Sequence, residues 1–351
     1  MSLARLKIEG VRNLAPTSIQ PGSSINWFQG PNGAGKTSVL EAVFLLARGR
    51  SFRSHRISSM IQHGQELMRV VGHRAEDDAV MGMERSVGSW RGRIGGRECQ
   101  RLSEFAACLP LVLMQPDSHR LIDGTPENRR QYLDWQLFHV EPSYLPTWQR
   151  YARYLRQRNA GLKSGADDAV LRALEAPMAE AGERMGALRA GVVDVLAGAA
   201  VSLAGSLNIR LPGDIELRYR AGYDPGEGLA AALDHSRARD RELGYTRRGP
   251  HRAELVISCG GQAAAQELSR GQQKLMALLL LLAQLQALQQ GSIRPLLLLD
   301  DPVSELDRDH FSRLQAWLER QAAQVWVTST ESCVGSAKVF HVEQGRIEPV
   351  V

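Results

Sequence analysis

A glycine-rich turn near the N-terminus carries the side chains best suited to phosphate chemistry. Residues 30–37, GPNGAGKT, match the pattern G-x-x-x-x-G-K-[S/T] and lie between a predicted strand and a predicted helix. In such a turn the backbone N–H groups face phosphate oxygens, and the helix N-terminus adds partial positive charge. Lys36 is expected to reach the β- and γ-phosphates, and Thr37 to hold Mg²⁺. We therefore predict a nucleotide site formed by Gly30, Pro31, Asn32, Gly33, Ala34, Gly35, Lys36, Thr37 and Ser38.

Two consecutive carboxylates follow a short apolar run much later in the chain. The segment PLLLLDD, residues 295–301, is typical of a buried strand that delivers its acids to the edge of a sheet. Asp300 is expected to support Mg²⁺, and Asp301 to orient or deprotonate an attacking water. The alternative is that the two acids cap the helix that follows.

A second polar turn, residues 268–273 with the sequence LSRGQQ, opens directly into a long apolar helix. Ser269, Gly271 and Gln272 would lie at a helix N-terminus, which attracts anions. Because the chain holds only one complete glycine-rich phosphate loop, a partner copy is the economical source of that anion. We predict a C₂ dimer in which each copy's turn caps the γ-phosphate of ATP on the other copy. ATP would close this dimer, and hydrolysis would loosen it.

The periodicity of apolar residues predicts elements that could position these groups. The predicted strands are residues 3–11, 24–29, 66–74, 79–87, 89–95, 109–115, 214–220, 253–260, 295–300 and 324–330, with a final hairpin that turns at Gln344-Gly345. The predicted helices are a segment after residue 36 ending near Gly49, a short helix over 57–63, a helical middle from Thr125, a segment over 167–207, and a helix over 309–322. The sequence therefore indicates an α/β core assembled from both chain ends, residues 1–124 with 245–351, and a mainly helical lobe over 125–244.

Composition narrows the class of protein. The chain has 351 residues and a net charge of +5, which permits nucleic acid as a partner without requiring it. Its four cysteines form no Cys-x-x-Cys pair, so neither a zinc site nor a disulfide framework is indicated. The longest apolar run, Leu275 to Ala283, is far shorter than the roughly 18 residues of a membrane span. A soluble, cytoplasmic protein without a membrane partner is expected.

Several motifs together resemble ABC-type ATPases. The segment 268–273 resembles their signature motif, with Arg270 in place of the first glycine, and DPVSELD, residues 301–307, resembles their D-loop. The resemblance implies that Asp307 contacts nucleotide and that Gln115 acts in catalysis and metal binding as the Q-loop glutamine. At the switch position, where transporters carry histidine, the chain offers Ser329 or Thr330.

Other stretches narrow the resemblance to the RecF family of bacterial recombinational repair ATPases, in matching order over nearly the whole chain. They are IEGVRNL (8–14), GRSFRS (49–54), QPDSHRLIDGTPENRRQYLD (115–134) and TRRGPHRAEL (246–255). The resemblance implies an ABC-type P-loop ATPase head with a short helical arm, which binds single- and double-stranded DNA with ATP and Mg²⁺. It further implies an ATP-dependent homodimer, slow DNA-stimulated hydrolysis, and partnership with RecO and RecR in loading RecA at gaps.

Basic residues outside the phosphate loop have two interpretations. As a set they could line a DNA groove, while individually each is typical of a solvated surface; they are Arg50, Arg53, Arg56, Arg129, Arg130, Arg247, Arg248 and Arg252. Arg12, beside the first strand, is expected to brace a nucleotide phosphate. His251 is expected to be structural rather than catalytic.

Two other functions remain open from the sequence. A transporter or ribosome-associated ABC ATPase is disfavoured by the missing switch histidine and the single nucleotide-binding unit. A scaffold that binds nucleotide without hydrolysing it is disfavoured by Asp301 beside Asp300.

Overall fold

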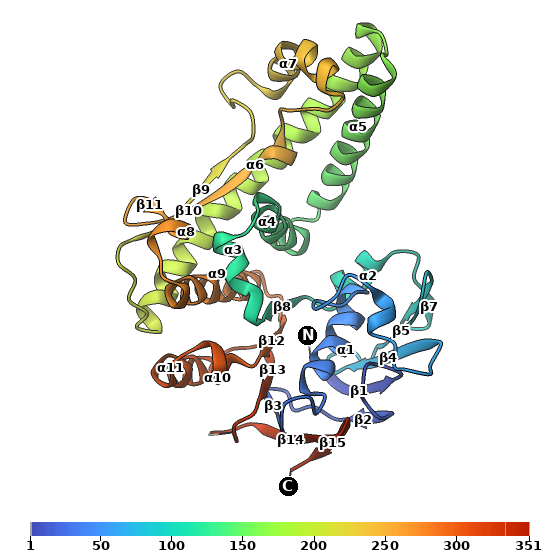
Figure 1. Cartoon of the computed structure of the whole chain (residues 1–351), viewed down its shortest axis with the longest axis vertical. Helices are drawn as coiled ribbons and strands as arrows, with labels where there is room; N and C mark the ends of the chain where they lie inside the picture. Colours follow the sequence, from blue (N-terminus) through green and yellow to red (C-terminus); the bar gives the residue numbers. More distant parts are fainter. Residues whose placement is uncertain (1, 334, 351) are drawn as a thin grey trace. The chain divides into compact units, whose positions relative to one another are not determined.

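Both ends of the chain contribute to the same folding unit of the computed structural model, which describes residues 2–333 and 335–350. Unit 1 comprises residues 1–118, 204–209 and 284–351, and unit 2 comprises residues 119–203 and 210–283. Figure 1 shows the elements of each unit. The predicted borders at residues 124 and 245 stay predictions.

The central sheet of unit 1 has six strands in the order β15-β14-β3-β13-β12-β8. Its strands are β3 (Ile25–Gln29), β8 (Leu111–Met114), β12 (Leu296–Asp300), β13 (Gln324–Ser329), β14 (Lys338–Glu343) and β15 (Arg346–Pro349). All neighbours pair in parallel except β14 and β15, which form the predicted hairpin at Gln344-Gly345. Every residue of β12 and β13 is buried, because both faces of a parallel sheet are covered. The continuous apolar runs seen in the sequence are thus explained.

The second sheet of unit 1 is antiparallel, in the order β2-β1-β4-β5-β6-β7. Its strands are β1 (Leu3–Glu9), β2 (Thr17–Ile19), β4 (Leu67–Arg74), β5 (Val80–Ser86), β6 (Trp90–Ile94) and β7 (Arg97–Glu98), which confirms the predicted meander. The prediction of a short helix over residues 57–63 is wrong. Only η1 (Ile57–Ser59) makes a 3₁₀ turn, because Ile61 extends to form a bridge with Val11.

Helix α1 (Lys36–Arg48) joins the two sheets of unit 1 into one core. Eleven of its 13 residues are buried, and it contacts β4 and β5 of one sheet and β12 and β13 of the other. It ends at Gly49, as predicted, in a left-handed cap. The remaining helices of unit 1 are α2 (Leu102–Cys108), α10 (Pro302–Glu305) and α11 (Arg308–Leu318), and η2 (Pro116–His119) begins at its border.

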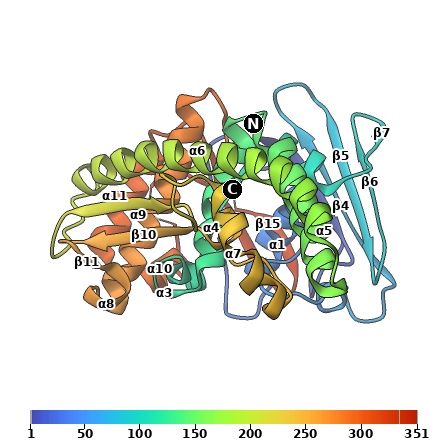
Figure 2. The same ribbon diagram turned by 90° about the horizontal axis from the view of Figure 1, so that it is seen from above.

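Unit 2 is mainly helical and holds one small antiparallel sheet, in the order β11-β10-β9. Its elements are α3 (Arg120–Asp123), α4 (Pro126–Val140), α5 (Tyr144–Ser164), α6 (Asp168–Ser206), β9 (Ile215–Arg220), α7 (Leu229–Leu243), η3 (Pro250–Arg252), β10 (Glu254–Cys259), β11 (Gln262–Ala263), α8 (Ala264–Glu267) and α9 (Arg270–Gln290). The C-terminal ends of two of these helices, residues 204–206 of α6 and 284–290 of α9, belong to unit 1. Strands β9 and β10 pair side by side, and α6 runs along them in both views (Figure 1, Figure 2).

The predicted segment over 167–207 is one 39-residue helix, α6. Gly182 lets α7 and α5 approach it, since a Cβ atom there would lie 2.4 Å from Leu229 Cδ2 and 3.0 Å from Tyr151 Cε2. Among the described residues, α6 is also the one helix long and apolar enough to cross a membrane, a test that core helices of soluble proteins pass as well.

Candidate nucleotide-binding site

The glycine-rich turn connects β3 to α1 at the end of the parallel sheet. Gly35 has φ 114°, a conformation that side chains disfavour, and a Cβ atom at Gly30 would lie 2.0 Å from the carbonyl oxygen of Val342. Lys36 Nζ donates hydrogen bonds to the carbonyl oxygens of Gly30 and Pro31, at 2.8 and 3.0 Å. Burial lowers the pKa of Lys36, while the charges of Asp301 and Asp300 oppose this shift. The ammonium group is therefore held at the inner edge of the turn.

Thr37 and Asp300 are brought together by the fold. Thr37 Oγ1 donates to Asp300 Oδ1 at 2.7 Å, and Thr328 Oγ1 donates to the same oxygen at 2.9 Å. Burial raises the pKa of Asp300, and the two hydroxyl hydrogen bonds partly reverse the shift. Thr328 was not among the residues predicted from the sequence. Its signal is the parallel register of β12 and β13, which sets Thr328 beside Asp300.

The predicted switch residues lie just beyond this cluster. Ser329 is fully buried, and its hydroxyl accepts a hydrogen bond from the backbone N–H of Glu331 at 2.9 Å. Thr330 is exposed in the turn after β13. Thr328 instead lines the hollow beside the phosphate loop, and its hydroxyl also accepts the backbone N–H of Asp301 at 2.9 Å.

Asp301 lines the same hollow and has a strained backbone. Its φ of 50° and ψ of 52° lie in the left-handed region, which aspartate adopts at a cost. Although it occupies the N-cap position of α10, its side chain makes no capping hydrogen bond. The alternative of a helix cap therefore does not account for the Asp301 carboxylate. Asp300 is engaged with the two threonines and caps no helix either.

A hollow of about 480 Å³ opens beside the phosphate loop. Lys36, Thr37 and Asp301 line it together with two arginines, Arg12 and Arg53. Of the other predicted nucleotide-binding residues, Asn32, Gly33, Gly35 and Ser38 also line the hollow. The structure thus brings together most of the predicted phosphate loop on one surface.

A buried carboxylate holds the two arginines at this hollow. Arg12 Nε and Nη2 donate to Glu41 at 2.9 and 2.8 Å, and Arg53 Nη1 lies 3.7 Å from the same carboxylate. Glu41 is fully buried within α1 and also accepts the hydroxyl of Ser51. Arg53, predicted as a DNA contact, is therefore positioned at the nucleotide hollow. The sequence offered no signal for Glu41 beyond its place on α1.

Asn13, which was not predicted as a site residue, connects the segment after the first strand to the phosphate loop. Its side chain donates to the carbonyl oxygen of Gly33 at 3.0 Å and accepts the hydroxyl of Ser38 at 3.0 Å. Both hydrogen bonds fix the loop in the shape that lines the hollow. Asn13 itself belongs to the lining.

The donor set fits Mg²⁺ bound with phosphate and water. Thr37 Oγ1 and Asp300 Oδ1 are hard oxygen ligands in contact with one another. In the part of the chain that the structure describes, no cluster of three or more His, Cys, Asp or Glu side chains forms a metal site. Mg²⁺ suits this arrangement, because it keeps several waters and takes only one or two protein ligands beside phosphates.

Gln115 lies one residue beyond β8. In the register of β8 and β12, Met114 pairs with Leu299, so Gln115 and Asp300 follow at the same edge of the sheet. Its backbone N–H donates to Ser118 Oγ at 2.9 Å. Gln115 is half-buried and is not part of the described lining of the hollow.

The polar turn before α9 belongs to unit 2 and is exposed. The Ser269 N–H donates to Gln272 Oε1 at 3.0 Å, and the Gln272 N–H donates to Ser269 Oγ at 3.4 Å. This reciprocal pair is a capping box, with Ser269 as the N-cap and Gln272 three residues later. A Cβ atom at Gly271 would meet nothing within 4 Å, so the helix start has open space beside it.

Asp307, predicted to contact nucleotide, caps α11. Its carboxylate accepts the backbone N–H of His310 at 2.8 Å, and this hydrogen bond lowers its pKa. The other carboxylate oxygen lies 2.6 Å from His310 Nδ1, and the Asp307 side chain is 64% exposed.

The arginines predicted to contact DNA divide into groups. Arg129 makes a two-bond ion pair with Glu254 at 2.7 and 3.0 Å, and Arg130 donates to the carbonyl oxygen of Ala253 at 2.9 Å. Both therefore brace α4 against β10. The others have exposed side chains; they are Arg50, Arg53 and Arg56 in unit 1, and Arg247, Arg248 and Arg252 in unit 2.

His251 is structural, as expected. Its Nε2 lies 3.0 Å from the carbonyl oxygen of Thr246, which can only accept, so Nε2 carries the proton. Its Nδ1 then accepts the hydroxyl of Tyr151 at 2.7 Å. Burial lowers the pKa of His251 to about 4, which keeps the ring neutral near pH 7.

Comparison with known proteins places the chain in a family. Residues 2–341 match the model of the RecF/RecN/SMC N terminal domain. The chain is 41% identical to the DNA replication and repair protein RecF of Xanthomonas axonopodis pv. citri, over 99% of this chain and 98% of that protein. It is 39% identical to the RecF of Azotobacter vinelandii, with the same coverage.

Solved structures agree with the sequence relatives. The structure described as the recombination mediator protein RecF-ATP in the RecFOR pathway superposes with a TM-score of 0.89 at 25% identity, covering 99% of this chain and 97% of that one. An Smc head bound to the C-terminal winged-helix domain of ScpA superposes with a TM-score of 0.60 at 16% identity, which shows a shared fold, and covers 99% of this chain and 96% of that one. The predicted α/β fold of an ABC-type ATPase head is confirmed, and the chain belongs to the RecF family.

Proposed function

We propose that this protein is an ATPase of DNA replication and recombinational repair. The observation that carries the proposal is the contact of Thr37 and Thr328 with Asp300, next to Lys36 and in one hollow with Asp301. This combination supplies a cation for phosphates, a pair of oxygen ligands and a free carboxylate. Membership of the RecF family, whose relatives are named as DNA replication and repair proteins, supports the biological setting.

Each side chain then has a defined task. Lys36 and the backbone N–H groups of residues 32–38 bind the β- and γ-phosphates, while Arg12 and Arg53, which line the same hollow, add positive charge. Thr37 and Asp300 would hold Mg²⁺, with Gln115 at the same edge of the sheet, and the ion would neutralise charge on the phosphates. Asp301 orients the attacking water and accepts its proton, since its carboxylate is not used as a cap.

The exposed turn before α9 supports a homodimer that closes on ATP. Ser269, Gly271 and Gln272 would cap the γ-phosphate of ATP bound to the partner copy, and Asp307 would approach the same nucleotide. Hydrolysis would remove this contact and open the dimer. DNA, single- or double-stranded, would bind to the closed form, and RecO and RecR would act with it in loading RecA at gaps. The RecFOR pathway named for the structural relative supports these partners, and the protein would work in the cytoplasm.

The first experiment is the solution mass by light scattering, with ATP·Mg²⁺ and with ADP·Mg²⁺, each with and without a short duplex. We expect the mass to double with ATP only, and the duplex to co-migrate with the dimer. Lys36→Ala should remain monomeric with ATP. Ser269→Arg should bind nucleotide as a monomer and fail to dimerise, because the larger charged side chain fills the open helix start. A monomer in all conditions would contradict the closing dimer, while the ATPase site would still be tested by hydrolysis.

A further inference from the structure

A second hollow, of about 830 Å³, lies wholly within unit 2. Its walls are the end of β9 with the loop after it, and the segment from residue 245 to the start of β10. Three aromatic rings line it: Tyr219, Tyr223 and Tyr245. Tyr245 is 40% exposed, so one ring is accessible to a flat ligand. We name this feature the Tyr–Arg hollow.

Four arginines share the hollow with these rings: Arg220, Arg247, Arg248 and Arg252. All four are exposed, and within residues 2–333 and 335–350 none of them forms an ion pair with a carboxylate. The one acid in the lining, Glu254, is already neutralised by its two-bond pair with Arg129. The hollow therefore carries four uncompensated positive charges.

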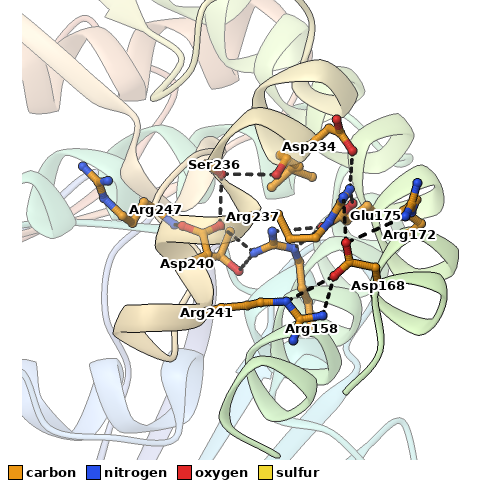
Figure 3. Close-up of polar contacts among 12 residues, drawn as sticks. Arg158, Asp168, Arg172, Glu175, Asp234, Ser236, Arg237, Asp240, Arg241 and Arg247 are labelled. Carbon is orange, nitrogen blue, oxygen red and sulfur yellow. Dashed lines mark hydrogen bonds and ion pairs between the residues drawn. The ribbon is translucent and has the colours of Figure 1, made fainter. Parts of the chain in front are cut away.

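Other arginines of unit 2, unlike those of the hollow, form ion pairs with carboxylates. Arg158 pairs with Glu175 and Asp240, Arg237 pairs with Glu175 and Asp234, and Arg241 pairs with Asp168. Figure 3 shows these contacts between α5, α6 and α7, with the Arg247 side chain extending away from them. The guanidinium groups of the hollow have no such carboxylate partner. Their positive charge is therefore available to an anionic ligand.

Hydrogen bonds to α5 and α7 hold the loop that carries Arg247 and Arg248 in place. The Thr246 N–H donates to Asn159 at 2.8 Å, the Arg247 N–H donates to Asp240 at 3.2 Å, and His251 bridges Thr246 and Tyr151. These contacts fix the backbone while the guanidinium groups remain free. A site that is rigid before binding loses less entropy when its ligand arrives.

The two walls of the hollow also touch one another. The Gly249 N–H donates to the carbonyl oxygen of Gly222 at 3.2 Å, and a Cβ atom at Gly222 would lie 2.4 Å from the Gly249 oxygen. Gly222 has φ 81°, so both its conformation and its contact require glycine. The spacing of the tyrosines and arginines is therefore set by backbone contact.

We infer that the Tyr–Arg hollow binds an unpaired stretch of single-stranded nucleic acid. Its phosphates would pair with the arginines, and a base would stack on Tyr245, whose ring already has Arg252 at 5.4 Å. A nucleotide strand carries an anion and a flat ring at every nucleotide, and the lining of this hollow offers guanidinium groups for the first and phenol rings for the second. Duplex bases are stacked on one another and cannot enter, and an acidic peptide supplies charge without flat rings. The inference rests on the proposed DNA function and adds a place within unit 2 where an unpaired strand is held.

Fluorescence anisotropy with a labelled oligothymidylate tests the inference across a salt series, on the full chain. The double substitution Arg247→Gln and Arg248→Gln should weaken binding about tenfold and reduce the salt slope by about 1.4, since each single-strand phosphate contact contributes about 0.7. The matched control, Arg153→Gln with Arg156→Gln, removes two exposed arginines from α5 and should leave binding unchanged. If both double substitutions weaken oligothymidylate binding equally, the effect is one of total charge and the assignment of the site is overturned.

The role of the ring is tested separately. Tyr245→Leu should weaken binding of the oligothymidylate about tenfold, since stacking on an aromatic ring is worth about 1–3 kcal/mol per base. Tyr245→Phe should restore it, and an abasic strand should bind wild-type and Tyr245→Leu protein equally. If Tyr245→Leu binds both strands as wild type does, the ring contacts no base and the inference is overturned.

Competition distinguishes the alternative ligands. Thymidine monophosphate and polyglutamate should fail to displace the oligothymidylate at matched phosphate or carboxylate concentration. Displacement by the monophosphate would assign the hollow to a free nucleotide, and displacement by polyglutamate to an acidic peptide; either result overturns the inference. ATP hydrolysis by the same variants reports on the proposed function, because no residue of the hollow lines the nucleotide site. ATP hydrolysis should persist in the hollow variants, and its absence from wild-type protein would contradict the proposed function itself.

Discussion

Thr37 Oγ1 lies 2.7 Å from Asp300 Oδ1, although 263 residues separate them in the chain. The contact exists because β3 and β12 both neighbour β13 in the parallel sheet, so their carboxyl ends meet at one edge. Thr328, from β13 itself, completes the group by donating to the same oxygen. A phosphate loop from one end of the chain is thereby joined to acids from the other end.

Thr328→Val should lower the rate of ATP hydrolysis about tenfold, because it removes the hydroxyl that holds both Asp300 and the backbone N–H of Asp301. The same change leaves the backbone N–H of Asp301 without its hydroxyl partner, so the free energy of unfolding should also fall, by about 1–3 kcal/mol. Thr328→Ser keeps the hydroxyl and should retain most of the rate. Steady-state hydrolysis at saturating ATP·Mg²⁺ measures both variants; equal rates for valine and wild type would show that the hydroxyl does not position the acids.

Asp301→Asn should reduce hydrolysis by at least about 100-fold while preserving ATP binding, because an amide cannot accept the proton of the attacking water. Single-turnover hydrolysis and equilibrium binding of a fluorescent ATP analogue separate the two effects. The variant should also accumulate the ATP-dependent dimer in light scattering. Since the carboxylate makes no capping bond, thermal stability should be unchanged; a large loss of stability would restore the capping interpretation.

The phosphate loop and PLLLLDD could be predicted because short-range patterns determine them: a strand, a glycine turn, and an apolar run that ends in acids. Helix α7 escaped prediction because two charged residues, Arg237 and Asp240, occupy its buried face and interrupt the apolar period. The role of Thr328 was not predicted because it depends on the register of two strands. The ion pair of Arg129 was not predicted because its partner, Glu254, lies 125 residues away in the chain. Tertiary pairing, which local patterns do not encode, decided each of these cases.

Arg158→Leu should destabilise unit 2 by about 3–5 kcal/mol, because it leaves the buried carboxylates of Glu175 and Asp240 without their shared cation. The Arg158 side chain is fully buried, whereas Arg239, paired with Glu242, is 61% exposed. Arg239→Leu should therefore cost less than about 1 kcal/mol. Hydrogen exchange of the α7 amides measures the difference locally. Equal protection in the two variants would mean that solvent already screens the pairs shown in Figure 3.

The stability of unit 2 should fall as the pH is lowered from about 6.5 to about 4, through His251. Its pKa in the folded protein is lowered to about 4 from the ordinary 6.5, so in this window the unfolded chain binds a proton that the folded chain refuses. Above pH 6.5 both states are neutral, and the effect vanishes. The full shift corresponds to roughly 3 kcal/mol, at about 1.4 kcal/mol per pKa unit.

Hydrogen exchange of unit 2 between pH 7 and pH 4.5, corrected for intrinsic exchange rates, measures this loss. His251→Gln should flatten the pH dependence, since its amide can replace both hydrogen bonds without titrating, whereas His63→Gln, at an exposed position of unit 1, should leave it as in wild type. An unchanged slope in His251→Gln would assign the pH dependence to the carboxylates. Because His251 supports the loop that carries Arg247 and Arg248, oligothymidylate binding by His251→Gln should likewise lose pH sensitivity over the same range.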